Sequence, residues 1–180
     1  MMTSAQLAKL KEHDKRIAAV HEAGHAVVLL LECPHVRIRP WIRERDCDDP
    51  SAETTWEGHV EMFTWKPVRK NSVRKNSVIA VAGIVAEWLA EDGDVSSDEI
   101  MEMWDGVGRE PSPADLAICS PNWRIRQNAV EQALDLLRGQ KLLFDRIVLE
   151  LLEEESITDG QMAGLAGQFQ TIKAKKKGNK

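Results

Sequence analysis

The sequence predicts a mainly α-helical domain with a small β-hairpin or short sheet after its first helix. Three observations support this fold class. Apolar residues recur at helical spacing along most of the chain, two short segments within residues 36–63 have the character of strands, and helix-starting motifs recur in the C-terminal half. With 180 residues, 43% of them hydrophobic and 29% charged, the chain is long enough to build one domain with its own core.

The predicted domain spans residues 14–170. It lies between a flexible N-terminus at 1–13 and a disordered basic tail at 171–180, which is rich in lysine. Asp14 is a candidate N-cap for a first helix that continues to about Glu32. No change of composition inside residues 14–170 marks a second domain.

The remaining elements follow from the alternation of apolar segments and turn residues. Val36–Ile42 and Thr54–Phe63 have the character of two short strands. The sequence VRKNS occurs twice, as Val68–Ser72 and Val73–Ser77, at the start of a second helix that reaches about Ala90. Further helical segments are predicted after a capping box at Ser96, after Ser112, and over residues 121–138, 140–155 and 158–169.

Composition disfavours several classes of partner. The formal net charge of −5 does not favour nucleic acid, and the longest apolar run, Ala26–Leu31, is too short to span a membrane. Cys33, Cys47 and Cys119 are odd in number and widely spaced, which predicts neither a disulfide framework nor a thiolate zinc site. The N-terminus does not resemble a signal peptide. We therefore expect a cytoplasmic protein that binds neither nucleic acid nor membrane.

The motif with the most chemical content is His21-Glu22-Ala23-Gly24-His25, an HExxH sequence inside the first predicted helix. Residues four apart on a helix differ by only about 40° around its axis, so both imidazoles face the same way. Two neutral nitrogens can then bind one Zn²⁺, with Glu22 beside them as a base for water. The alternative is a pair of core histidines with ordinary hydrogen-bond partners. A metal would supply a partner to both histidines at once.

A catalytic zinc site needs a third protein ligand and one open position. The sequence places no third histidine at a suitable spacing after the motif, which leaves acidic candidates: Asp115 in "PSPADLAICS" and Glu87 in "AVAGIVAEWLAED". Each has a simpler alternative interpretation. Asp115 could be the N3 residue of a capping box opened by Ser112, and Glu87 could be a surface carboxylate.

Substrate binding is predicted along the second strand. If Thr54–Phe63 is an edge strand, an extended polypeptide could add to it by β-augmentation, and the alternative is ordinary pairing with the first strand. The chain contains no tyrosine, so His59 is a candidate for stabilising an oxyanion, against the alternative of a solvated strand histidine. The candidate cleft residues are His59, Val60 and Glu61, together with Trp56, Trp65 and Trp104, for which a core position is the alternative.

Three segments together resemble a known family. "HEAGHAVV", "VAGIVAEWLA" and "SPADLA" are similar, in this order and spacing, to the "HEAGHA", "AGR.AEEL" and "SNDL..AT" segments of the peptidase domain of the FtsH-type AAA proteases. The C-terminal stretch "VEQALDLLRGQKLLFDRIVLELLEEESITDGQM" resembles that family's closing helices, with their "L...LLE.E.LTG.E" signature. The resemblance covers roughly Arg16–Leu165 and is most specific in "HEAGHA".

This resemblance implies a zincin-like helical metallopeptidase domain. It implies that His21, His25 and Asp115 are zinc ligands, that Glu22 is the general base, and that Glu87 supports a zinc histidine from the second shell. The flanking residues depart from the family pattern, since Ile84 replaces the arginine of "AGR.AE" and Pro113-Ala114 replaces Ser-Asn. These departures concern substrate handling more than the zinc site.

The function predicted from these motifs is that of a zinc metalloendopeptidase acting on flexible or unfolded polypeptides. The sequence has no GxxxxGK[ST] loop, so we expect a separate ATPase or adaptor to deliver any folded substrate. Two alternatives remain: a zinc-stabilised regulatory or binding module with little turnover, and a stress-response protease that cuts one repressor. The oligomeric state is not predicted.

Overall fold

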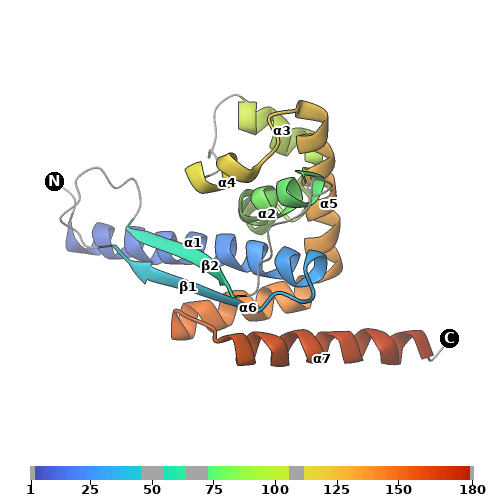
Figure 1. Ribbon diagram of the computed structural model, residues 1–180. Helices are drawn as coiled ribbons and strands as arrows, with labels where there is room; N and C mark the ends of the chain where they lie inside the picture. The colour runs from blue at the N-terminus through green and yellow to red at the C-terminus, as the bar shows by residue number, and fades with distance from the viewer. Residues whose placement is uncertain (1–2, 46–54, 64–72, 106–111, 179–180) are drawn as a thin grey trace.

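In a computed structural model of the chain, the structure describes residues 3–45, 55–63, 73–105 and 112–178, without the side chains of 103–105 and 169–178. Figure 1 shows helices packed against one another, with a small two-stranded sheet lying alongside α1, which confirms the mainly α-helical prediction. The elements are α1 (Ser4–Glu32), β1 (Ile38–Glu44), β2 (Trp56–Met62), α2 (Val73–Glu91), α3 (Ser97–Asp105), α4 (Pro113–Ile118), α5 (Trp123–Gly139), α6 (Lys141–Glu154) and α7 (Asp159–Gly178).

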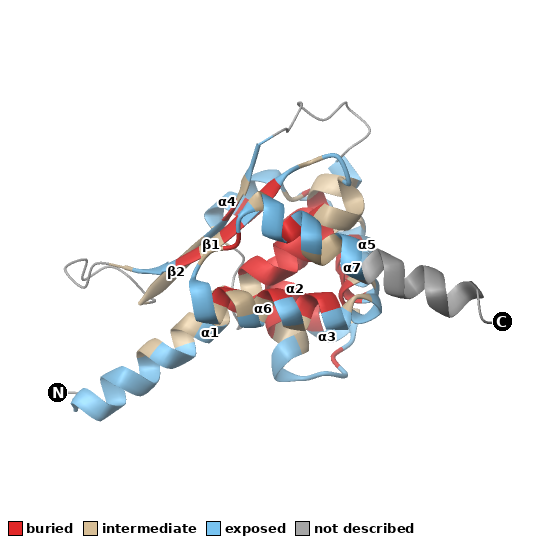
Figure 2. Cartoon of the chain, turned by 90° about the horizontal axis from the view of Figure 1, so that it is seen from below, coloured by how far each residue is buried: buried red, intermediate tan, exposed pale blue. Residues whose placement is uncertain are grey.

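The core lies where the middle of α1 packs against α2, α5 and α6 (Figure 2). Helix α2 is buried over the whole of Ser77–Glu87, as expected for a helix that is apolar all round. Gly24 allows the close approach of α1 and α2, because a Cβ atom there would lie 2.5 Å from the Ala82 carbonyl oxygen and from the Ala86 Cβ.

Strands β1 and β2 form an antiparallel pair, in register from Ile38 opposite Met62 to Glu44 opposite Trp56. The second edge of β1 is covered by the connection between α6 and α7. There the Ile42 amide donates to the Glu155 carbonyl at 2.8 Å, and the Ile157 amide donates to the Pro40 carbonyl at 3.0 Å. In the part of the chain that the structure describes, no strand pairs with the second edge of β2, so β2 is an edge strand there.

The start of the first helix was predicted wrongly. α1 begins at Ser4, and Thr3 is its N-cap, with a capping box formed by the side chains of Thr3 and Gln6. Asp14 therefore lies inside the helix rather than at its cap. Its carboxylate accepts hydrogen bonds from the Thr55 amide at 2.8 Å and the Thr55 hydroxyl at 2.9 Å, which fixes the start of β2 against α1.

Other helix boundaries follow the prediction more closely. α2 begins at Val73, in the second VRKNS copy, whereas the first copy lies outside the described residues. The Ser96 capping box at the start of α3 is present. α7 extends to Gly178 and so covers 171–178 of the segment predicted as a disordered tail. Within the described ranges, no helix has the length and apolarity needed to cross a membrane.

Candidate metal and catalytic site

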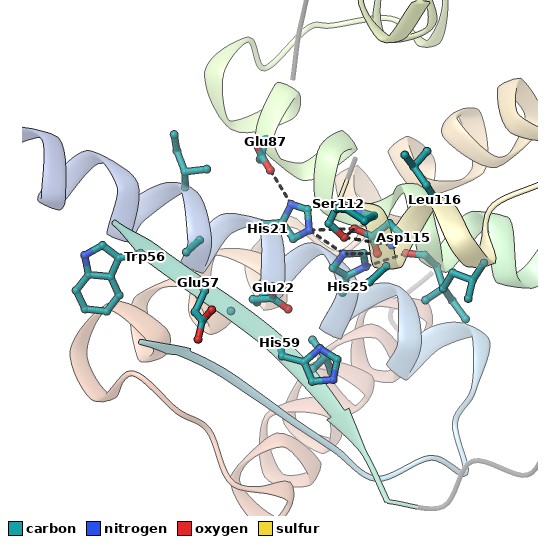
Figure 3. Close-up of a pocket in the computed structure, with 18 of the residues that line it drawn as sticks. His21, Glu22, His25, Trp56, Glu57, His59, Glu87, Ser112, Asp115 and Leu116 are labelled. Atoms are coloured by element: carbon teal, nitrogen blue, oxygen red, sulfur yellow. Dashed lines mark hydrogen bonds and ion pairs between the residues drawn. The ribbon is translucent and has the colours of Figure 1, made fainter. Parts of the chain in front are cut away.

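His21 and His25 lie one turn apart on α1 and turn their rings to the same side (Figure 3). Their Nε2 atoms are 3.0 Å apart. Each Nδ1 atom has its own partner: His21 Nδ1 contacts Glu87 Oε1 at 2.6 Å, and His25 Nδ1 contacts the Ile79 carbonyl oxygen at 2.8 Å. Because a carbonyl oxygen can only accept, His25 donates through Nδ1, and a neutral ring then has its Nε2 lone pair free for a metal.

Asp115 reaches the histidine pair from α4. Its place in the helix is that of an N3 residue, and the Ser112 hydroxyl caps α4 by accepting from the Asp115 amide at 3.1 Å. The same hydroxyl donates to Asp115 Oδ2 at 2.7 Å. The carboxylate oxygens lie 3.5 Å from His21 Nε2 and 3.4 Å from His25 Nε2. Asp115 is therefore the N3 residue that Ser112 caps and also the acid beside the histidines, so a place in the helix cap and a place at the site are compatible.

The two acidic candidates for a third ligand lie on different sides of His21. Asp115 faces both Nε2 atoms, whereas Glu87, on α2, contacts the Nδ1 atom of His21 on the other side of the ring. Glu87 is also buried, with 7% of its surface exposed, rather than a surface carboxylate. In this arrangement Asp115 has the geometry of a ligand, and Glu87 has that of a group that orients one.

The three side chains fit one tetrahedral Zn²⁺. The two Nε2 atoms are 3.0 Å apart, and the nearest carboxylate oxygens lie 3.5 Å from His21 Nε2 (Oδ2) and 3.4 Å from His25 Nε2 (Oδ1); ligands at 2.0–2.1 Å from a tetrahedral zinc are roughly 3.3–3.4 Å apart. Two imidazoles and one carboxylate are a donor set that zinc accepts, and three protein ligands leave a fourth position. Among the described residues, His21, His25 and Asp115 are the group close enough together to hold a metal ion.

The electrostatics of this cluster suit a cation. Burial lowers the pKa of His21, but its hydrogen bonds to the Asp115 and Glu87 carboxylates outweigh that effect and raise the pKa to about 10. Burial raises the pKa of Asp115, and its hydrogen bonds with His21 and His25 reverse this and hold the pKa well below the usual range. Without a bound cation, a proton on His21 would balance the carboxylates, and a metal can replace that proton.

Glu22 lies next to the ligand pair, on the side of α1 that faces β2. It is 6% exposed, and its carboxylate forms no hydrogen bond or ion pair with the described residues. Burial raises the pKa of Glu22, and the nearby imidazoles of His25, His21 and His59 partly offset this effect. A buried carboxylate with a raised pKa and no fixed partner has the properties of a general base.

The cluster opens into a cleft of about 1450 Å³, bounded by α1, β2 and α4. This volume exceeds the 300–1,000 Å³ of ordinary small-molecule pockets, so the cleft has room for an extended polymer. Trp56 lines it and also packs, partly buried, against the core, whereas Trp65 and the side chain of Trp104 lie outside the described residues.

The three predicted substrate-binding residues do not behave alike. His59 is exposed and lines the cleft, with its ring centroid 6.2 Å from that of Trp41. Val60 also lines the cleft, although its side chain is buried in the core. Glu61 accepts a hydrogen bond from Trp41 Nε1 at 3.2 Å and is absent from the residues that line the cleft.

Two glycines at the site were missed by the sequence analysis as functional positions. A Cβ atom at Gly83 would lie 2.4 Å from Cε1 and Nε2 of His21, and a Cβ atom at Gly58 would lie 2.5 Å from Cγ of Glu22. For Gly58 a signal existed, since an isolated glycine in a strand pattern often marks a close approach. Compared with known proteins, the chain matches no family model and no curated sequence.

Proposed function

We propose that the protein is a zinc-dependent metalloendopeptidase that hydrolyses peptide bonds in flexible or unfolded polypeptides. The observation that carries the proposal is the cluster of the His21 and His25 Nε2 atoms with the Asp115 carboxylate, which has the buried Glu22 carboxylate beside it. A site that only stabilises the fold needs no such base. The resemblance of the three quoted motifs to the FtsH-type peptidase domain supports the same activity.

Each polar residue of the site has a proposed role. A bound Zn²⁺ supplies a Lewis acid that lowers the pKa of a water molecule and polarises a peptide carbonyl. Glu22 accepts a proton from the attacking water and passes it to the leaving amine, and its raised pKa suits both transfers. Glu87 and the Ile79 carbonyl hold the two imidazoles by their Nδ1 atoms, so that their Nε2 atoms face the metal position.

The outer edge of β2 is the proposed site for the polypeptide backbone. The amides of Phe63 and Arg45 donate to Arg37 and Thr55 across the sheet, so every second residue of β2 forms its hydrogen bonds with β1. The backbone groups of the alternate residues, including Gly58 and Val60, point away from β1. These two residues line the cleft, so an extended substrate can pair with β2 by β-augmentation next to Glu22.

The opposite wall of the cleft favours apolar substrate side chains. Leu116 and Ile118 of α4 both line it and are 43% and 47% exposed. Exposed aliphatic side chains in a cleft are typical of a binding surface. We expect the enzyme to prefer substrates with an apolar residue near the bond that is cut. A separate ATPase or adaptor would be needed for stably folded substrates.

The proposal is tested by metal analysis and a cleavage assay on an unstructured polypeptide such as reduced, alkylated casein. We expect about one zinc per chain and cleavage that Glu22→Gln abolishes while zinc stays bound. Glu12→Gln is the matched control, because it makes the same change on an exposed part of α1 and should leave cleavage unchanged. A protein that binds zinc but cleaves nothing, with or without Glu22, would instead be a zinc-stabilised binding module.

A further inference from the structure

We propose that Gly58 is a positioning residue. Because glycine has no side chain, the space between β2 and α1 stays open for the Glu22 carboxylate, which can then lie beside the metal ligands. A Cβ atom at position 58 would lie 2.5 Å from Cγ, 3.0 Å from Cδ and 2.9 Å from Oε1 of Glu22. This inference rests on the proposed function for its consequence in catalysis. The contact itself can be tested without zinc or activity.

The direction of Gly58 follows from the sheet. Side chains alternate between the two faces of a strand, so position 58 shares its face with Val60, which is 5% exposed and belongs to the core. Position 58 therefore faces α1, and the strand passes directly over Glu22 there. The same residue presents its backbone groups at the free edge of β2, so the base and the proposed substrate strand meet at Gly58.

The glycines of the site differ in which atoms an added Cβ atom would displace. At Gly24 a side chain would meet the backbone of α2, and at Gly83 it would meet the imidazole ring of His21. At Gly58 the three nearest atoms all belong to the side chain of Glu22, which can rotate. An alanine at 58 would therefore displace the carboxylate and leave the fold and the three zinc ligands in place.

The expected displacement is large enough to matter for catalysis. Ordinary contacts of a Cβ atom begin near 3.4 Å, so Cγ of Glu22 must move by about 0.9 Å from its 2.5 Å distance. A misplacement of about 1 Å can reduce a rate by about 100-fold. We expect Gly58→Ala to lower kcat by about 100-fold, with KM and zinc affinity close to those of the unmodified protein.

The first experiment measures kcat and KM on an unstructured peptide and zinc affinity by competition with a chelator. Gly93→Ala is the matched control, because no atom lies within 4 Å of a Cβ atom at that position. Loss of kcat with zinc and KM retained supports the proposal. An unchanged kcat in Gly58→Ala overturns it, and so does a loss of zinc affinity as large as the loss of kcat.

The second experiment is a double-mutant cycle on the metal-free proteins, read as melting temperature. Gly58→Ala is made in the natural chain and in a Glu22→Ala background, where the side chain that it would contact is gone. We expect the change in Tm to be more favourable in the Glu22→Ala background by at least about 2 °C. Equal changes in both backgrounds overturn the proposal. A positive cycle with an inactive natural chain would reject the peptidase function and retain the contact.

Discussion

Replacing Gly83 by alanine should weaken zinc binding while leaving the fold intact. A Cβ atom at this position would lie 2.4 Å from Cε1, 2.4 Å from Nε2 and 2.6 Å from Nδ1 of His21, so it would press on the face of the ring. Ordinary contacts begin near 3.4 Å, and the imidazole must therefore retreat by about 1 Å from the 2.4 Å contacts. Zinc–nitrogen bonds tolerate only about 0.2 Å, so His21 could not stay at bonding distance.

The expected loss of zinc affinity is about 100-fold, or about 2.8 kcal/mol. This magnitude is the upper end of the range for losing a group that orients a ligand, and here the ligand itself is displaced. The stability of the metal-free fold should change little, because the preference of a helix for alanine over glycine, about 1 kcal/mol, offsets part of the cost of moving the ring. The affinity is measured by competition with a chelator of known strength, and the metal-free stability by thermal unfolding.

The control for this variant is Gly93→Ala, which adds the same atom in open space and should change zinc affinity little. The reasoning is refuted if Gly83→Ala binds zinc as tightly as the natural chain. It is also refuted if the metal-free variant unfolds before zinc can be tested, because the ring of His21 would then be unable to move aside.

Three further predictions follow from the same cluster. Asp115→Ala should lower zinc affinity by 100-fold or more and Glu87→Gln by about 10-fold, measured by the same competition, and equal losses would contradict their separate roles. Zinc affinity should rise roughly tenfold per pH unit from 7 toward 10, because binding displaces a proton from His21, whose pKa is about 10; an affinity independent of pH would contradict this. Glu22→Gln should raise the Tm of the metal-free protein near neutral pH. The pKa of Glu22 is raised in the folded state, so the protonated carboxyl is compatible with the fold and the ionised carboxylate, which forms as the pH rises, destabilises it. In acid, where Glu22 is protonated, the variant and the natural chain should have the same Tm.

Where local pattern decides the structure, the sequence was sufficient. The four-residue spacing of His21 and His25 depends only on helix geometry, and both imidazoles do lie on one side of α1. The capping motif at Ser112 is equally local, and it predicted both the start of α4 and the place of Asp115 within it. The confirmed part of the fold is of this kind: helices with clear starts and one short antiparallel sheet.

The misplaced start of α1 has a local cause as well. The sequence offers two candidate N-caps for this helix, Asp14 and Thr3, and it is Thr3 that forms a capping box with Gln6. Residues between them include alanine, leucine, lysine and glutamate, which favour continuing a helix over ending it. Asp14 is occupied instead by the amide and hydroxyl of Thr55, a contact between segments 41 residues apart that no local pattern can predict.

The residues of α2 that support His21 could not be predicted from the sequence, because of the composition of this helix. A helix that is buried from Ser77 to Glu87 has no polar face, so hydrophobic periodicity does not say which of its sides meets α1. Gly83 and Glu87 are one turn apart, and both touch His21: the first leaves room for the ring, and the second holds its Nδ1 atom. That pairing depends on how α1 and α2 are rotated about their axes, which is set by the close contact at Gly24. A glycine four residues before a glutamate in an apolar helix can therefore predict that the helix supports a metal-binding histidine. The prediction is possible only when the packing of that helix against the histidine-bearing helix is already known.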